Sequence, residues 1–135
     1  MAITDFWIKM LKEVPDEAWN VWDIWNMMTN RLPYVKTIAY AESHDQALVG
    51  DTTIASRLME KEMYTDMNRA YQNIIVDLGI ALHTMTRFIT TPLGGQAYLH
   101  FMGNEIGHPE RIDCLRQGTG RRYAPVSSIK LTLTK

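Results

Sequence analysis

Residues 37–46 read TIAYAESHDQ, an apolar run that ends in a cluster of carboxylate, hydroxyl and imidazole side chains. Residues 97–110 read AYLHFMGNEIGHPE and repeat this arrangement. Short apolar runs are typical of buried strands, so residues 36–41 and 97–102 are predicted to be strands. The segment between them contains apolar residues at helical spacing. Together they predict a strand–helix–strand unit whose two strands are parallel neighbours.

The polar residues that follow the two apolar runs are the candidate functional residues. In parallel α/β folds, ligands bind at the edge of the sheet where the strands end. We therefore expect the loops at 42–46 and 103–110 to be neighbours and to line part of a cleft. From the residues alone, His44 and Asp45 fit either a catalytic or ligand-binding site or a capped loop with an ion pair.

A metal site is a second possibility at the same edge. Histidine and carboxylate ligands together suit iron, zinc or manganese. Such a site would combine His44 and Asp45 of the first loop with Glu105 and His108 of the second.

Length and composition predict one domain and exclude several classes of protein. The chain has 135 residues, of which 46% are hydrophobic and 21% charged, and its formal net charge is −1. These values fit neither a disordered chain nor a protein that binds nucleic acid. Its one cysteine, Cys114, excludes an intramolecular disulfide. We identify no signal peptide and no run long enough to cross a bilayer. The expected location is the cytoplasm, without a membrane partner, and the oligomeric state is not predicted.

Two helices are predicted before the first strand. The first is capped by Thr4 or Asp5, continues to Val14 and is stopped by Pro15. The second ends near Asn30 and carries Trp22, Trp25 and Met28 at intervals of three residues. All four tryptophans lie within the first 25 residues. They either fill a core or form an exposed apolar surface that requires a partner, and the two interpretations agree if that partner is the rest of a larger domain.

Two further helices are predicted between the strands. One runs from about residue 52 to 67, with a partly apolar face. The clearer one covers residues 74–91 and ends at Pro92 and the glycines that follow. Its apolar face is predicted from residues at three- and four-residue steps: Ile75, Leu78, Leu82, Met85 and Ile89. Two parallel strands with open edges do not make a complete sheet, so we expect a piece of a larger α/β barrel or sheet.

Two motifs in this chain resemble those of a known family. Residues 40–51, YAESHDQALVGD, resemble the strand-seven motif of glucan branching enzymes, in the α-amylase superfamily. Residues 101–110, FMGNEIGHPE, resemble the strand-eight motif of the same family. The resemblance covers roughly residues 5–120. It implies an α/β fold: a partial TIM (β/α)8 barrel with strand seven, its helix, strand eight and the preceding helices. Residues 1–120 would be the C-terminal part of this catalytic barrel, and residues 121–135 a divergent tail that is either frayed or an edge strand.

The resemblance also implies a reaction and a set of site residues. The family transfers α-1,4-glucan segments to α-1,6 branch points, as in glycogen, through three carboxylates and without a cofactor. The third carboxylate matches Asp45, which would stabilise an oxocarbenium-like transition state. His44 matches a neighbouring donor to sugar hydroxyls. Asn104, Glu105 and His108 match a motif that lines the cleft and binds substrate.

The other two carboxylates of the family match no segment of this chain. Residues 41–43 imitate an acid/base motif, but Glu42 shares its strand with Asp45 and is therefore assigned to strand seven. Because the chemistry needs both a nucleophile and an acid, we expect the 135-residue chain alone to be inactive. The chain also departs from the family at Ile106 and Arg111, where aromatic residues are usual. The alternative is a piece that binds glucan or assembles with other parts without catalysis.

Overall fold

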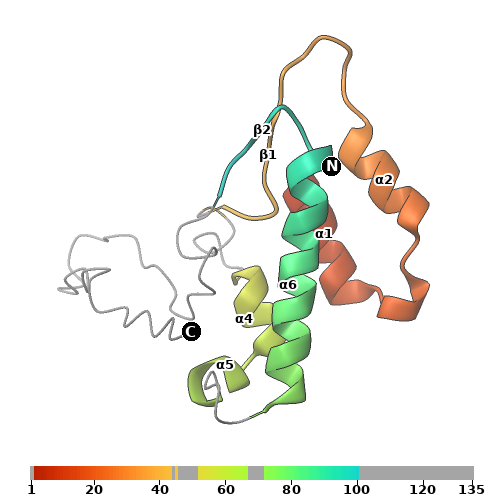
Figure 1. The fold of residues 1–135 in the computed structure, drawn as a ribbon. Helices are drawn as coiled ribbons and strands as arrows, with labels where there is room; N and C mark the ends of the chain where they lie inside the picture. Colours follow the sequence, from red (N-terminus) through yellow and green to blue (C-terminus); the bar gives the residue numbers. More distant parts are fainter. Residues whose placement is uncertain (1, 44, 46–51, 67–71, 101–135) are drawn as a thin grey trace, which may run out of the picture.

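The computed structural model describes residues 2–43, 45, 52–66 and 72–100 (Figure 1). Within these ranges most of the chain is helical, and two short strands form a small sheet. The elements in chain order are α1 Ile3–Glu13, the 3-10 helix η1 Asp16–Ala18, α2 Val21–Thr29, β1 Ile38–Ala39, α4 Ile54–Met59, α5 Glu62–Thr65, α6 Ile74–Leu93 and β2 Ala97–Tyr98.

Strands β1 and β2 are parallel neighbours, as the sequence predicts. Ile38 is paired with Ala97 and Ala39 with Tyr98. The chain crosses from one strand to the other through α4, α5 and α6 (Figure 1). Both strands are shorter than the predicted ranges. Ile38 belongs to the sheet but is 65% exposed, so the described residues leave the face of the sheet to which it points largely uncovered.

Helix α6 forms where it is predicted, but only the C-terminal part of its predicted apolar face is covered: Leu82, Met85 and Ile89 are half-buried, and Ile89 packs against the core. Ile75 and Leu78 are exposed. The buried residues, also at three- and four-residue steps, are Val76, Gly79, His83, Thr86 and Thr90. Helix α4 packs against this face. At Gly79 an added Cβ would collide with the Met59 side chain, so the absence of a side chain allows the two helices to approach closely.

The C-terminal end of α6 also differs from the prediction. Pro92 lies inside the last turn, and the helix continues to Leu93. The carbonyl that loses its helical donor because of Pro92 belongs to Phe88. Since Phe88 is on the exposed side of the helix, water can bind this carbonyl.

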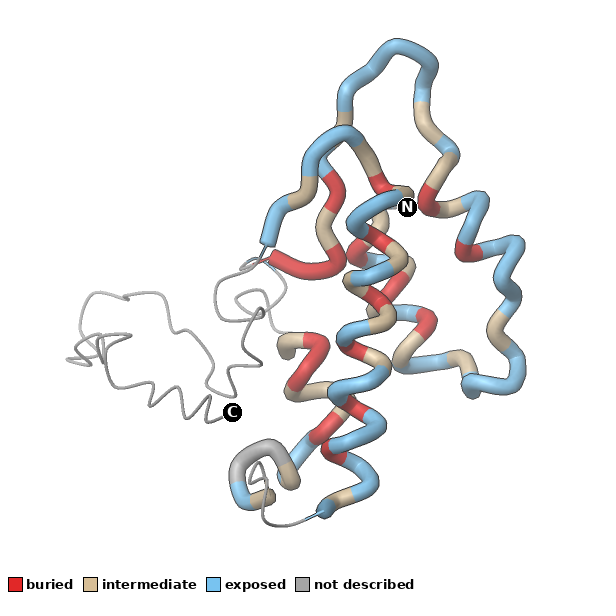
Figure 2. Tube along the Cα trace, in the orientation of Figure 1, coloured by how far each residue is buried: buried red, intermediate tan, exposed pale blue. Residues whose placement is uncertain are grey.

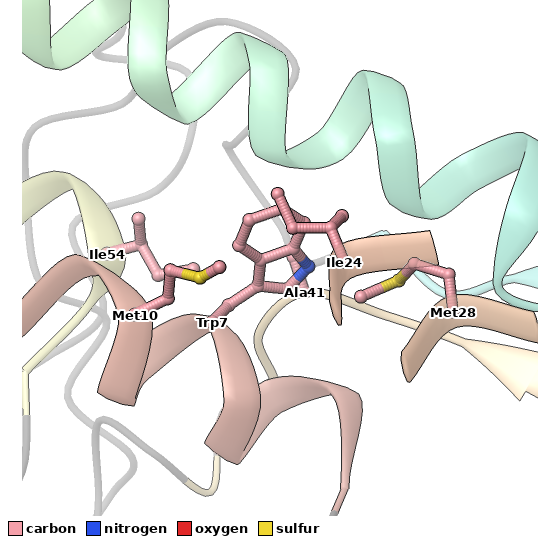
Figure 3. Close-up of a cluster of buried hydrophobic side chains, with 6 residues drawn as sticks. All are labelled: Trp7, Met10, Ile24, Met28, Ala41 and Ile54. Carbon is pink, nitrogen blue, oxygen red and sulfur yellow. The ribbon is translucent and has the colours of Figure 1, made fainter. Parts of the chain in front are cut away.

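The hydrophobic core lies where α1, α2, the end of β1 and α4 meet. It contains Trp7, Met10, Ile24, Met28, Ala41 and Ile54, with Trp7 in the middle of the cluster in Figure 3. Figure 2 shows buried residues recurring along α6, with exposed residues between them. A second, smaller cluster joins α4 to α6 through Ala55, Met59 and Val76.

The two N-terminal helices differ from the prediction in two details. Helix α1 begins one residue before Thr4, with Ala2 as its N-cap. Thr4 is buried in the first turn, and the Asp5 carboxylate accepts a hydrogen bond from the Ala2 N–H. Helix α2 has the predicted end at Thr29. However, Trp22 and Trp25 are 67% and 47% exposed, and α2 instead buries Ile24 and Met28. The tryptophans therefore divide between the core and an exposed apolar surface.

The helix predicted at 52–67 is interrupted. Thr53 caps α4, with its hydroxyl oxygen accepting a hydrogen bond from the Ser56 N–H. Glu60 then adopts φ 46°, in the left-handed region, and this conformation ends α4 before α5 begins at Glu62.

By length and composition, α6 could cross a membrane, contrary to the expectation from the sequence. It has 20 residues and a mean hydropathy of 1.2. Core helices have the same properties, and α6 packs against α2 and α4 and buries His83, Thr86 and Thr90. Its apolar character is therefore only weak support for a membrane span.

Candidate functional site

Asp45 lies just beyond the end of β1, at the edge of the sheet where the sequence predicts a site. The three residues Ala41, Glu42 and Ser43 leave the strand and are all buried. Asp45 is exposed. Its backbone N–H donates a hydrogen bond to Ser43 Oγ, with a distance of 3.3 Å between the two heavy atoms. An exposed aspartate thus lies two residues beyond the buried segment 41–43.

The other four predicted site residues, His44, Asn104, Glu105 and His108, lie outside the described residues. Their proximity to Asp45 stays a prediction. Three of them, together with Asp45, would also be needed for the alternative metal site. Within the described ranges, no group of three or more His, Cys, Asp or Glu side chains could hold a metal ion.

Glu42 is the residue whose surroundings the sequence did not predict. Its side chain is 3% exposed, and Oε2 accepts a 2.8 Å hydrogen bond from the backbone N–H of Ile54, at the start of α4. Its other oxygen, Oε1, lies 3.3 Å from Nε2 of His83 in α6. One buried carboxylate therefore joins three elements.

The chemistry of the Glu42–His83 contact depends on which atom carries the proton. An ionised carboxylate can only accept hydrogen bonds. With Glu42 ionised, His83 must therefore carry a proton on Nε2, and this N–H donates a hydrogen bond to Oε1. The structure places His83 in the core. The one sequence signal for such a pair was a glutamate placed directly after an apolar run that ends a predicted strand.

A second polar pair lies where β2 ends. Nη2 of Arg87, in α6, is within hydrogen-bonding distance of both ring nitrogens of His100. The rings of His100 and Tyr98 also stack at a tilt, with 5.8 Å between their centroids. His100 was expected inside a strand, but β2 ends at Tyr98 and His100 is exposed. The described chain thus places polar groups after both parallel strands.

A cavity of about 430 Å³ lies at the opposite edge of the sheet, where the strands begin. Its lining includes Thr37 and Ile38 at the start of β1 and Gly94 shortly before β2. The N-terminus of α1 and the C-terminal end of α2 complete the lining. Because Asp45 follows the other end of β1, this cavity does not belong to the candidate site.

The comparisons with known proteins concern almost the whole chain. No family model matches it. It is 56% identical over 138 aligned positions to the 1,4-alpha-glucan-branching enzyme of Yarrowia lipolytica. This chain is similar to one segment of branching enzymes. The match covers 97% of the chain but 20% of the Yarrowia protein.

Other proteins with the same name give the same result. The chain is 53% identical to the enzyme of Debaryomyces hansenii and 55% identical to that of Felis catus, with 92% and 91% of the chain covered. It spans 18% of the length of each. The chain therefore spans about a fifth of the length of these curated relatives, which include fungal and animal enzymes.

Proposed function

We propose that this chain forms the part of a 1,4-alpha-glucan branching site that presents Asp45 to the glucan. The observation that carries the proposal is the 56% identity to a branching enzyme over 97% of the chain. The parallel arrangement of β1 and β2 supports it, because Asp45 follows the end of β1 as a functional residue follows a strand of a parallel α/β fold.

In this proposal β1 and β2 are strands seven and eight of a (β/α)8 barrel, with α6 between them. The exposed apolar side chains support a larger domain. Six large hydrophobic residues are between 67% and 105% exposed: Val21, Trp22, Leu32, Tyr34, Ile74 and Phe88. Apolar surface of this extent is typical of faces that other protein covers. In a complete barrel, further strands would pair with the open edges of β1 and β2.

The proposed mechanism assigns Asp45 the stabilising role. Transfer of a glucan segment passes through a transition state with positive charge on the sugar ring. A fixed carboxylate beside this charge lowers its free energy, most strongly where water is excluded. His44, Asn104, Glu105 and His108 would bind sugar hydroxyls. The nucleophile and the general acid would come from outside this chain, and no cofactor is needed. The proposal includes a cytoplasmic location, which suits a chain with one cysteine.

The experiment that tests this function is a chimera. The 135 residues replace the matching segment of the Yarrowia lipolytica enzyme, and branching of amylose is measured. We expect the chimera to be active and Asp45→Asn to lower its rate by at least about 100-fold. Asp23→Asn, at an exposed position of α2, is the matched control and should leave the rate unchanged. The separate 135-residue chain should have no branching activity.

Two results would contradict the proposal. One is a folded chimera without branching activity. The other is an active chimera in which Asp45→Asn and Asp23→Asn have the same rate.

A further inference from the structure

We propose that Glu42 is the positioning residue of Asp45: its buried carboxylate fixes the end of β1 to α4 and α6, and so fixes where Asp45 stands. The proposal rests on the proposed function only for the role of Asp45. The positioning itself can be tested without any assay of branching.

The connection between Glu42 and its neighbours is made of contacts that are distant in sequence. The Ile54 N–H is 12 residues away and the His83 ring 41 residues away. Glu42, His83 and the Ile54 backbone lie in one buried region where α4 packs against α6. Because each carboxylate oxygen has its own partner, the side chain cannot rotate without losing a buried hydrogen bond.

The connection from Glu42 to Asp45 is short. Three peptide units separate the two residues, so their Cα atoms are at most about 11 Å apart. Ser43, between them, is buried, and its hydroxyl oxygen accepts the hydrogen bond from the Asp45 N–H. The exposed residue Asp45 is therefore connected to a segment in which Glu42 and Ser43 are held in the core.

A purely packing role would not favour a glutamate at this position. Removing a carboxylate from water is costly, and an apolar side chain of similar size is often at least as stabilising. A buried carboxylate with two directional partners, however, defines one orientation of the chain where an apolar side chain would allow several. Accurate placement is what a residue close to the reacting sugar requires, since small displacements lower rates strongly.

The test uses amide hydrogen exchange of the full 135-residue chain, measured by NMR at a temperature well below unfolding. His83→Leu removes the donor to Glu42 Oε1, whereas His83→Gln retains a side-chain N–H that can donate to it. We expect His83→Leu to raise the exchange rate of the Asp45 amide by about tenfold or more, and His83→Gln to restore most of the protection. The internal control is the amide of Trp22 in α2, which donates to the side chain of the N-cap residue Asn20 and has no link to Glu42.

A kinetic measurement in the chimera separates positioning from general stability. His83→Leu should lower kcat of the folded chimera by about tenfold to 100-fold and change KM by less than about twofold. His83→Gln should recover most of kcat. A role in stability alone would lower the fraction of folded enzyme without changing kcat per folded molecule.

Three results would overturn the positioning role. The first is an Asp45 amide that is unprotected in the unchanged chain. The second is a change in His83→Leu that is equal for the Asp45 and Trp22 amides, and the third is an absence of recovery in His83→Gln. Failure of the proposed function looks different: Asp45→Asn would leave the chimera active while the exchange results stand.

Discussion

The indole of Trp7 donates a 2.8 Å hydrogen bond from Nε1 to Thr90 Oγ1, a residue 83 positions further along the chain. Both side chains are completely buried. Thr90 in turn donates its hydroxyl proton to the carbonyl of Thr86, one turn earlier in α6. The contact therefore joins α1 to α6 inside the core with every polar atom of the two side chains paired.

This pairing predicts the effect of Trp7→Phe. The substitution removes the indole N–H and part of the ring, so Thr90 loses its donor and the core loses contacts. We expect the free energy of unfolding to fall by about 1–3 kcal/mol in urea denaturation followed by circular dichroism. The matched control is Trp22→Phe, at a residue that is 67% exposed. This substitution should change the free energy of unfolding by less than about 0.5 kcal/mol. Equal losses in the two variants would contradict the packing described here.

A second prediction concerns the contact of α4 with α6. Gly79→Ala should gain about 1 kcal/mol of helix propensity. However, the new methyl group would collide with the Met59 side chain, and overpacking typically costs about 1–3 kcal/mol. We expect a net loss of up to about 2 kcal/mol in the free energy of unfolding.

The double variant with Met59→Ala tests the cause of that loss. Removing the Met59 side chain makes room for the methyl group, so the two substitutions should be non-additive by at least about 0.5 kcal/mol. If Gly79→Ala alone stabilises the protein, the close approach of α4 to α6 is absent.

The sequence predicted the order of the elements better than their faces. Alternation of apolar runs with helical spacing was enough to predict β1 and β2 as parallel neighbours. The most deeply buried residues of α6 were missed because three of them, His83, Thr86 and Thr90, are polar. Polar residues are usually exposed. Here they are buried because each has a hydrogen-bond partner, and two of those partners, Glu42 and Trp7, are far away in sequence.

For the candidate site, the structure shows the position of Asp45 after β1, and the roles of the predicted site residues stay predictions. A motif of adjacent residues indicated Asp45, and the end of a strand is where such a residue is expected. The role of Glu42 was not predictable, because it depends on contacts with α4 and α6 that form only in the folded chain. The break at Glu60 was likewise missed, since a left-handed conformation at a glutamate has no local sequence signal.

A third prediction measures the Glu42–His83 pair by a double-mutant cycle. His83→Leu leaves one oxygen of a buried carboxylate without its donor, so we expect a loss of about 1–3 kcal/mol in the free energy of unfolding. In a background of Glu42→Leu the same substitution should cost less, because no carboxylate is left unpaired. The coupling energy should be at least about 1 kcal/mol. Additive effects would mean that the two side chains do not interact.

The last prediction concerns the exposed tryptophans of α2 and tests the larger domain directly. Trp22 and Trp25 are exposed in this chain, and serine has about the same helix propensity as tryptophan. In the separate chain, Trp22→Ser with Trp25→Ser should therefore change the free energy of unfolding by less than about 1 kcal/mol. In the chimera the same pair should lower the melting temperature clearly, since burying one large apolar side chain is worth about 1.5–3 kcal/mol. Asp23→Ser, on the same helix, is the control: it also introduces a serine, but it removes a carboxylate rather than apolar area. A chimera that tolerates both serines as well as it tolerates Asp23→Ser would show that this face of α2 stays in water, and the proposed barrel would then lack one of its supports.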